Sequence, residues 1–119
     1  MKIDLPYPPS ANRYLRHTAR GTYRTKLAND YCAIAANAAS LSGAILELSC
    51  VMLKATLHPR MTKAGVASKV RLDLDNCVKV AIDALAGVCF VDDKQVTHLA
   101  LSIGAPIVGG GLTLEVLPA

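Results

Sequence analysis

Residues 70–85, VRLDLDNCVKVAIDAL, indicate both how this chain folds and where its chemistry lies. Val70 to Leu74 alternate in polarity as a strand does, and a helix is expected to begin near Asp73 or Asp75 and to end at Gly87. The side chains predicted to form the buried stripe of this helix are Val78, Ala81, Ile82 and Leu85. The stretch therefore predicts a strand followed by a helix, with acidic residues where the two meet.

The acidic residues are concentrated in one part of the chain. Five of the nine lie within 21 positions, and they are Asp73, Asp75, Asp83, Asp92 and Asp93. Asp73 and Asp75 project to the same side of an extended segment because they are two residues apart. If Asp93 folds back beside them, each like-charge pair costs about 4 kcal/mol at ~4 Å and an effective dielectric of about 20. Such clusters persist where a hard divalent cation binds among the oxygens, which indicates Mg²⁺ or Mn²⁺.

Each of these residues also has a structural interpretation. Asp73 or Asp75 could cap the helix that follows, and Asp92-Asp93-Lys94 is by itself an ordinary turn. Lys79 could pair with Asp75 or Asp83 on the helix surface. In a phosphate-directed site the same ammonium would instead neutralise charge that builds on the attacked phosphate. Spacing alone leaves these alternatives open.

The basic residues lie away from the acidic cluster. The chain carries a formal net charge of +4, and eleven of its thirteen Lys and Arg residues fall within residues 1–26 and 54–71. A basic surface around an acidic pocket is what cleavage of nucleic acid by a metal-dependent enzyme needs. The alternative is that the two basic segments are ordinary solvated loops.

Other classes of protein are disfavoured by the sequence. The four cysteines show no C-x-x-C spacing and the three histidines are scattered, so a structural zinc site is not expected. No apolar run approaches the ~18–20 residues of a membrane span, and prolines at 6, 8 and 9 interrupt the segment where a signal peptide would lie. A chain of 119 residues is therefore expected to be a single domain, residues 1–119, in the cytoplasm.

The remaining elements predict an α+β fold. Residues 2–5 are expected to form a strand, 10–24 a basic loop, 25–41 a helix, 44–57 a long strand and 58–69 a second basic loop. Thr25 can cap the helix, and its apolar face is predicted to comprise Leu27, Tyr31, Ile34, Ala35, Ala38 and Leu41. Residues 88–91 are expected to be a short apolar segment, for which a strand is one alternative, and alternation predicts strands over 97–103 and 112–116, joined through Gly109–Gly111 as an antiparallel hairpin. The prediction is a small mixed sheet of about four to five strands with two main helices.

Four sequence segments together resemble one known family. They are LPYPPSANRYLRH at 5–17, DLDN at 73–76 with Lys79, DAL at 83–85 and DDKQV at 92–96. In order and spacing these segments are similar to the RusA family of Holliday-junction resolvases, which phages and prophages often carry. The resemblance implies a homodimeric endodeoxyribonuclease of DNA recombination and repair that cuts four-way junctions with Mg²⁺, for which Mn²⁺ would substitute. It places the essential acidic residues at Asp73, Asp75 and Asp93 and the essential lysine at Lys79, with Asp92 as a neighbour of undecided role.

Contacts to branched DNA are predicted on both basic segments. Arginine binds phosphate bidentately, and the predicted DNA-binding residues are Asn12, Arg13, Arg16, Lys69 and Arg71. Tyr14 and Tyr23 could stack on an exposed base or be buried, and His98 is predicted to lie on the surface. Two other functions remain open: a DNA-binding module whose aspartates only cap a helix, and a metal-dependent phosphatase that acts on a small substrate.

Overall fold

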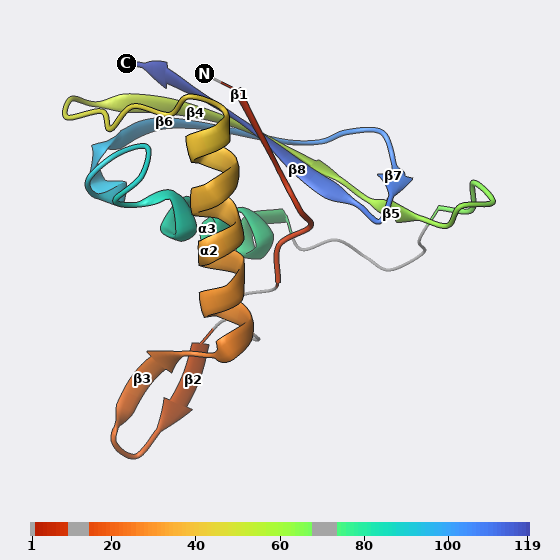
Figure 1. Ribbon diagram of the computed structural model, residues 1–119, viewed down its shortest axis with the longest axis horizontal. Coiled ribbons are helices and arrows are strands. Elements are labelled where there is room, and N and C mark those ends of the chain that lie inside the picture. Colours follow the sequence, from red (N-terminus) through yellow and green to blue (C-terminus); the bar gives the residue numbers. More distant parts are fainter. Residues whose placement is uncertain (1, 10–14, 68–73) are drawn as a thin grey trace.

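The computed structural model describes residues 2–9, 15–67 and 74–119 (Figure 1). Their elements in chain order are β1 (Lys2–Leu5), β2 (Leu15–Thr18), β3 (Gly21–Arg24), α2 (Lys26–Leu41), β4 (Val51–His58), β5 (Arg60–Met61), α3 (Leu74–Leu85), the 3-10 turn η1 (Asp93–Gln95), β6 (Val96–Ile103), β7 (Ile107–Val108) and β8 (Gly111–Pro118). Two helices with a mixed sheet of four strands and two smaller sheets confirm the predicted α+β class.

The main sheet has the strand order β1-β8-β4-β6. Strand β4 lies at its centre, antiparallel to β8 and parallel to β6. The connection from β4 to β6 passes through α3, as a parallel pair requires a crossover. The predicted antiparallel hairpin of the last two long strands is therefore wrong, because β4 lies between β6 and β8. Local alternation identifies both strands correctly, but their partner comes from a distant part of the chain.

The core lies between one face of the sheet and the two helices (Figure 1). Along β4 every second side chain is buried, from Val51 through Leu53 and Ala55 to Leu57. Three of the four predicted stripe residues of α3 are buried, and the fourth, Ile82, packs at the edge of the core. Helix α3 begins at Leu74, within the predicted range, and ends two residues before Gly87. The strand predicted for residues 70–74 falls mostly outside the described residues, and Leu74 itself is helical.

Helix α2 is capped as predicted but faces the core differently. Thr25 accepts a hydrogen bond from the backbone N–H of Ala28 at 3.3 Å. The buried face consists of Ala28, Tyr31, Ala35 and Ala39, while Leu27, Ile34 and Leu41 are exposed. Small alanines allow the helix to approach α3 and β1 closely, and the Tyr31 hydroxyl donates to the carbonyl of Pro6 at 3.0 Å. The prediction is confirmed for Tyr31 and Ala35, and Ala38 packs against the core, but it is wrong for the larger aliphatic residues, which are exposed.

Four further predictions need correction. The basic loop ends in a β2–β3 hairpin, whose turn places Gly21 at a φ of 126°. The long strand starts at residue 51 rather than 44, and residues 88–91 form turns with isolated bridges instead of a strand. Part of the second basic loop is β5, which pairs with β7. These segments are short or lack a clean two-residue period, so pattern alone did not identify them.

Among the described residues, no helix is long and apolar enough to cross a membrane.

The glycine turn before β8 supplies a stability prediction. Gly110 has a φ of 72°, and a Cβ atom there would lie 2.6 Å from the Tyr7 ring and 2.8 Å from the Arg60 side chain. Gly109 has a φ of 79° but no atom within 4 Å of such a Cβ. Gly109→Ala is expected to lower the free energy of unfolding by about 1–2 kcal/mol from backbone strain alone. Gly110→Ala adds overpacking and is expected to cost about 2–5 kcal/mol. Urea denaturation measures both, and equal losses would contradict the steric argument.

Candidate metal centre and nucleic-acid interface

The acidic turn between α3 and β6 is held by a capping box. Asp92 is the N-cap of η1, and its Oδ1 accepts a hydrogen bond from the backbone N–H of Lys94 at 3.0 Å. In return, Gln95 Oε1 accepts from the backbone N–H of Asp92 at 3.0 Å. These bonds fix the turn from both sides. Asp92 therefore has a structural role, and the adjacent Asp93 is left with an exposed carboxylate.

Gln95 also ties this turn to the body of the protein. Its Nε2 donates to the carbonyls of Glu47 at 2.9 Å and Ser49 at 2.8 Å, just before β4. Its Oε1 additionally accepts from the backbone N–H of Val91 at 2.7 Å. One side chain thus connects the two segments that lead into β4 and β6. Sequence reasoning missed Gln95, although an acid followed three residues later by Gln is the signal of a capping box.

The charge around Asp93 is unusually negative for an exposed turn. A hydrogen bond with Asp92 raises the pKa of Asp93, and partial desolvation and the charges of Asp92 and Asp83 raise it further. The pKa of Asp92 is lowered, first by the bond from the Lys94 backbone and then by the bond with Asp93. Asp83 of α3 therefore lies close enough for its charge to raise the pKa of Asp93. The fold brings the end of α3 near the acidic turn, whereas the predicted approach of Asp93 to Asp73 and Asp75 stays a prediction, because those two side chains lie outside the described residues.

Helix α3 presents Lys79 and Asp83 four residues apart, which places them on one face. Lys79 is exposed between the buried Val78 and Val80. Asp83 forms an ion pair with Arg24 at 3.4 Å, which joins the end of the β2–β3 hairpin to α3. Within the described part of the chain, Lys79 makes no ion pair with a carboxylate. The surface pair of Lys79 with Asp83 is therefore not seen.

Two of the three predicted metal ligands are not described. Asp73 lies outside the described residues, and so does the side chain of Asp75, whose backbone belongs to the first turn of α3. Among the side chains that are described, no three His, Cys, Asp or Glu residues lie close enough to hold a metal ion. The described carboxylates do offer the oxygen donors that a hard divalent cation binds. The three-carboxylate site remains a prediction, with Asp93 as its described member.

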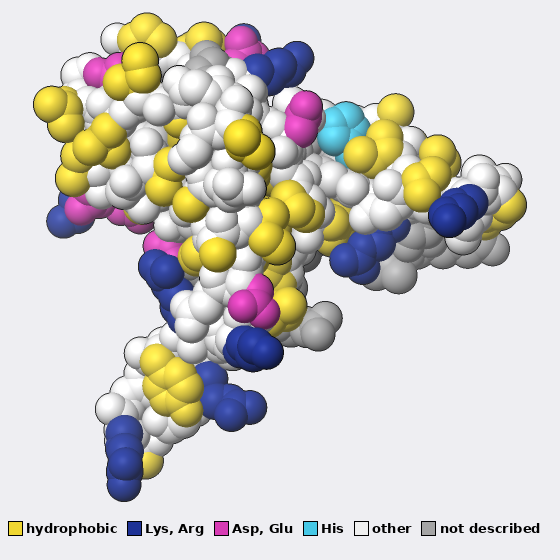
Figure 2. Space-filling model, in the orientation of Figure 1, with side chains coloured by type: hydrophobic (Ala, Val, Ile, Leu, Met, Phe, Trp, Pro, Cys, Tyr) yellow, Lys and Arg dark blue, Asp and Glu magenta, His cyan; other side chains and the backbone are white. Residues whose placement is uncertain are grey.

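The β2–β3 hairpin is a basic projection. Residues 16–24 are all exposed, and the hairpin stands away from the sheet beyond one end of α2 (Figure 1). Figure 2 shows Lys and Arg side chains gathered on it. Its cationic residues are Arg16, Arg20 and Arg24, and no acidic residue lies between Leu15 and Lys26. Arg16 is thus on the surface as predicted, whereas Asn12, Arg13, Lys69 and Arg71 lie outside the described residues.

The predictions for Tyr23 and His98 can be compared with the structure. Tyr23 on the hairpin is 51% exposed, so the buried alternative for this side chain is wrong. Tyr14 lies outside the described residues. His98 is exposed, as predicted. Arg20, at the hairpin turn, was not selected from the sequence, although it belongs to the same acid-free basic segment.

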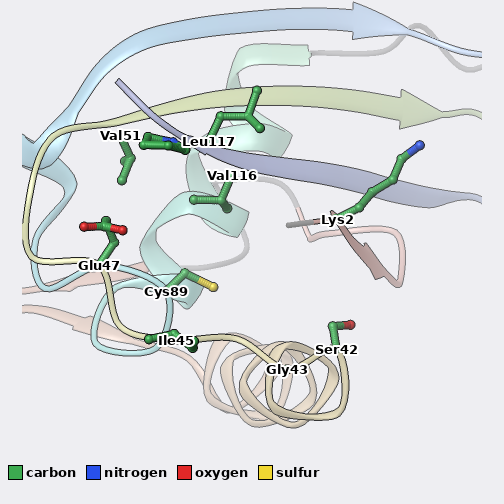
Figure 3. A pocket seen from close by; sticks show the side chains of 10 residues that line it. Lys2, Ser42, Gly43, Ile45, Glu47, Val51, Cys89, Val116 and Leu117 are labelled. Atoms are coloured by element: carbon green, nitrogen blue, oxygen red, sulfur yellow. The ribbon is translucent and has the colours of Figure 1, made fainter.

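A hollow near the acidic turn is of a different kind. A cavity of about 360 Å³ lies between the end of α2 and the adjoining ends of β4 and β8, with Glu47 and Lys2 on opposite sides of it (Figure 3). The rest of its lining is mainly apolar or small, including Ile45, Val51 and Cys89. One carboxylate among apolar groups does not provide the converging oxygens of a metal site. We therefore place the candidate site at the acidic turn and not in this cavity.

Exposed carboxylates near the end of α3 and a basic hairpin joined to the same helix by an ion pair are groups that a phosphate-directed protein can use. The family model described as Endodeoxyribonuclease RusA matches residues 6–116. Two similar proteins are each named crossover junction endodeoxyribonuclease RusA. They are 36% identical in Enterobacteria phage 82 and 37% identical in Escherichia coli strain K12, in both cases over 112 residues that cover 92% of this chain and 86% of the relative. The chain belongs to the RusA family.

Proposed function

We propose that this protein is a structure-selective endodeoxyribonuclease that resolves four-way DNA junctions with Mg²⁺, and that residues 1–119 act as one domain. The observation that carries the proposal is the position of the Asp93 carboxylate. Neighbouring carboxylates raise its pKa, and one of them, Asp83 on α3, also forms the ion pair that anchors the basic hairpin. A divalent cation relieves such a concentration of negative charge. The names of the relatives, crossover junction endodeoxyribonuclease, support the choice of substrate.

Asp73, Asp75 and Asp93 are the proposed metal ligands, and Mn²⁺ is expected to substitute for Mg²⁺. When bound, the ion would lower the pKa of a coordinated water and polarise the scissile phosphate. The chain supplies the positioning: the capping box of Asp92 and Gln95 fixes the backbone on both sides of Asp93. Lys79 is proposed to stabilise the negative charge that develops on the phosphate. Hydrolysis would leave a 5′-phosphate and a 3′-hydroxyl.

The proposed DNA contacts are Asn12, Arg13, Arg16, Lys69 and Arg71, to which the exposed Arg20 is added. The Arg24–Asp83 ion pair fixes the hairpin relative to α3, and Arg24 also donates to Cys32 Sγ at 3.4 Å. Arginines on a hairpin that is fixed to α3 in this way can contact phosphates of the same DNA arm whose strand is cut.

We also propose that two copies form a dimer, because a four-way junction offers two symmetry-related strands for paired nicks.

The hairpin arginines carry a prediction about salt dependence. Arg16→Ala and Arg20→Ala are each expected to weaken junction binding and to reduce the slope of log K against log salt by about 0.9 per lost phosphate contact. Titrations by fluorescence anisotropy at several salt concentrations measure this slope. Lys54→Ala is the matched control, because Lys54 is an exposed cation on β4, away from the hairpin. An unchanged slope in both arginine variants would remove the hairpin from the DNA interface.

One comparison tests the function as a whole. A four-way junction and a linear duplex with the same arm sequences are incubated with the protein and Mg²⁺, Mn²⁺ or EDTA. Paired nicks in the junction alone, present with either metal and absent with EDTA, are expected. Junction binding without metal-dependent nicking would favour the DNA-binding module. Hydrolysis of a simple phosphate ester without cleavage of branched DNA would favour the phosphatase.

A further inference from the structure

Arg60 on β5 is held over an aromatic ring. Its guanidinium carbon lies 4.4 Å from the centre of the Tyr7 ring. Tyr7 follows the end of β1 by two residues, so this stack joins the N-terminal segment to β5. The face of an aromatic ring attracts a cation, and a stacked guanidinium keeps the N–H donors along its edge available. The stack therefore orders Arg60 without occupying these donors.

Two further segments hold the Tyr7 side chain in place. At the turn before β8, a Cβ atom on Gly110 would lie 2.6 Å from the Tyr7 ring and 2.8 Å from Arg60 Cγ, so the absence of a side chain there leaves room for the stack. The Tyr7 hydroxyl makes a hydrogen bond with the thiol of Cys77, which is buried in α3. Burial raises the pKa of Tyr7 and the neighbouring Cys77 raises it further, although Arg60 lowers it. The stack therefore has a fixed position relative to α3.

The chain segments that meet at Arg60 are free of acidic residues. Residues 5–29, 48–72 and 94–114 contain no Asp or Glu, and Tyr7, Arg60 and Gly110 belong one to each. Among the side chains that the structure describes, Arg60 forms no ion pair with a carboxylate. Strands β5 and β7 lie at the end of the main sheet where β8 begins (Figure 1), and Figure 2 shows Lys and Arg side chains over this end of the molecule. An ordered guanidinium in such surroundings is suited to bind an anion.

We propose that Arg60 contacts a phosphate of the bound DNA and that Tyr7 is the residue that positions it for this contact. A planar guanidinium can donate two hydrogen bonds to one phosphate while its face stays on the ring. Ordering a long side chain opposes binding, and the stack has already ordered this one. Charge pattern did not distinguish Arg60 from the other cations of its basic segment, whereas the stack on Tyr7 does.

The inference rests on the proposed function for its ligand, branched DNA. Its test measures binding in EDTA, so the two can fail separately. Nicking of junctions by a protein whose binding does not depend on Arg60 would overturn this contact alone. Binding through Arg60 without metal-dependent nicking would overturn the nuclease proposal alone.

Replacing Arg60 with Ala tests the contact directly. Binding of a fluorescein-labelled four-way junction is measured by anisotropy in EDTA at several salt concentrations. Arg60→Ala is expected to weaken binding about tenfold and to reduce the slope of log K against log salt by about 0.9. Arg60 is exposed, so its circular dichroism spectrum should be that of the wild type. Lys54→Ala, which removes an exposed cation from β4, is the control and is expected to keep the wild-type slope.

Two substitutions of Tyr7 distinguish positioning from a structural role. Tyr7→Phe removes the hydroxyl that bonds with Cys77 and keeps the ring under Arg60, whereas Tyr7→Leu removes both. Both variants are expected to have a lower melting temperature, because each loses the hydrogen bond. Junction affinity should stay close to the wild-type value in Tyr7→Phe and should fall in Tyr7→Leu. The double variant Tyr7→Leu/Arg60→Ala is expected to bind no more weakly than Arg60→Ala, because the ring acts through Arg60.

If Tyr7→Leu fails to fold, Arg60→Lys tests the stack, because lysine keeps the charge but lacks the planar guanidinium. It is expected to bind the junction more weakly than the wild type and more tightly than Arg60→Ala. An unchanged salt slope in Arg60→Ala, or an equal loss of slope in Lys54→Ala, would overturn the phosphate contact. Wild-type affinity in Arg60→Lys, or equal losses of affinity in Tyr7→Phe and Tyr7→Leu, would overturn the positioning role of the ring.

Discussion

Replacing Asp93 with Asn is expected to reduce metal-dependent cleavage of a four-way junction by about 10³-fold or more while junction binding is retained. Loss of one carboxylate removes a proposed metal ligand and the several kcal/mol of charge stabilisation that a bound ion provides, at about 1.4 kcal/mol per tenfold in rate. Binding is expected to persist or to tighten slightly, because a negative charge next to the DNA is removed. Single-turnover cleavage and anisotropy binding measure the two effects. Asp73→Asn and Asp75→Asn are expected to give the same separation.

Asp92→Asn is a closely matched control for this experiment. It makes the same chemical change one residue away, and Asn can still accept the hydrogen bond from the Lys94 backbone as an N-cap. We expect it to retain most of the activity. Because Asp92 raises the pKa of Asp93, its neutralisation should lower that pKa. Asp93 then stays ionised to lower pH, so the variant should keep its activity on the acid side longer than wild type.

The two variants distinguish the structural role of Asp92 from the proposed metal-ligand role of Asp93. If Asp92→Asn were as inactive as Asp93→Asn, the turn would contribute two ligands and the cap would be incidental. If Asp93→Asn cleaved junctions at the wild-type rate, the proposed metal site would be wrong. Loss of thermal stability in Asp92→Asn alone would instead show that Asn does not replace the aspartate as a cap.

Features set by neighbouring residues were the ones predictable from the sequence. The Thr25 cap, the start of α3 and the alternation of β8 follow from hydrogen bonds or side-chain directions within one turn or strand, and all three are found. The partner of β6 was not predictable, because β4 is about forty residues away and its pairing depends on the crossover through α3. The face of α2 was predicted only in part: Tyr31 and Ala35 are buried as expected, but hydrophobic size favours Leu27 whereas close packing against α3 and β1 favours Ala28.

In the candidate site, too, some features have a local sequence signal and others depend on residues far apart in the chain. Composition and spacing selected Asp93 and Lys79, and the fold places the acidic turn next to α3. The capping box of Asp92 and Gln95 has a local signal that sequence reasoning missed. The additional bonds from Gln95 to the carbonyls of residues 47 and 49 involve a distant segment, which local spacing does not contain. The Arg24–Asp83 pair likewise joins segments almost sixty residues apart. Sequence reasoning therefore selected candidate reactive groups, which stay predictions, but not the distant contacts that hold the acidic turn and the hairpin in place.

Replacing Lys79 with Met is expected to slow single-turnover cleavage by about 10²–10³-fold, the usual loss when one group that stabilises transition-state charge is removed. Lys79 is exposed on α3, so the substitution should leave the fold and the melting temperature nearly unchanged. Junction affinity should fall by much less than the rate, because the proposed interaction is made mainly as charge develops on the phosphate. Lys79→Arg keeps the positive charge and is expected to recover part of the lost rate.

Lys94→Met distinguishes this role from a general effect of lowering positive charge near the site. Lys94 is also exposed and directly follows Asp93, yet its backbone N–H, not its side chain, makes the bond to Asp92. The Lys94→Met variant is expected to cleave the junction at close to the wild-type rate. If both lysine variants lost the same activity, with affinity falling in parallel, Lys79 would contribute to DNA attraction only. A large fall in rate at unchanged affinity, seen for Lys79→Met alone, places the ammonium at the reacting phosphate.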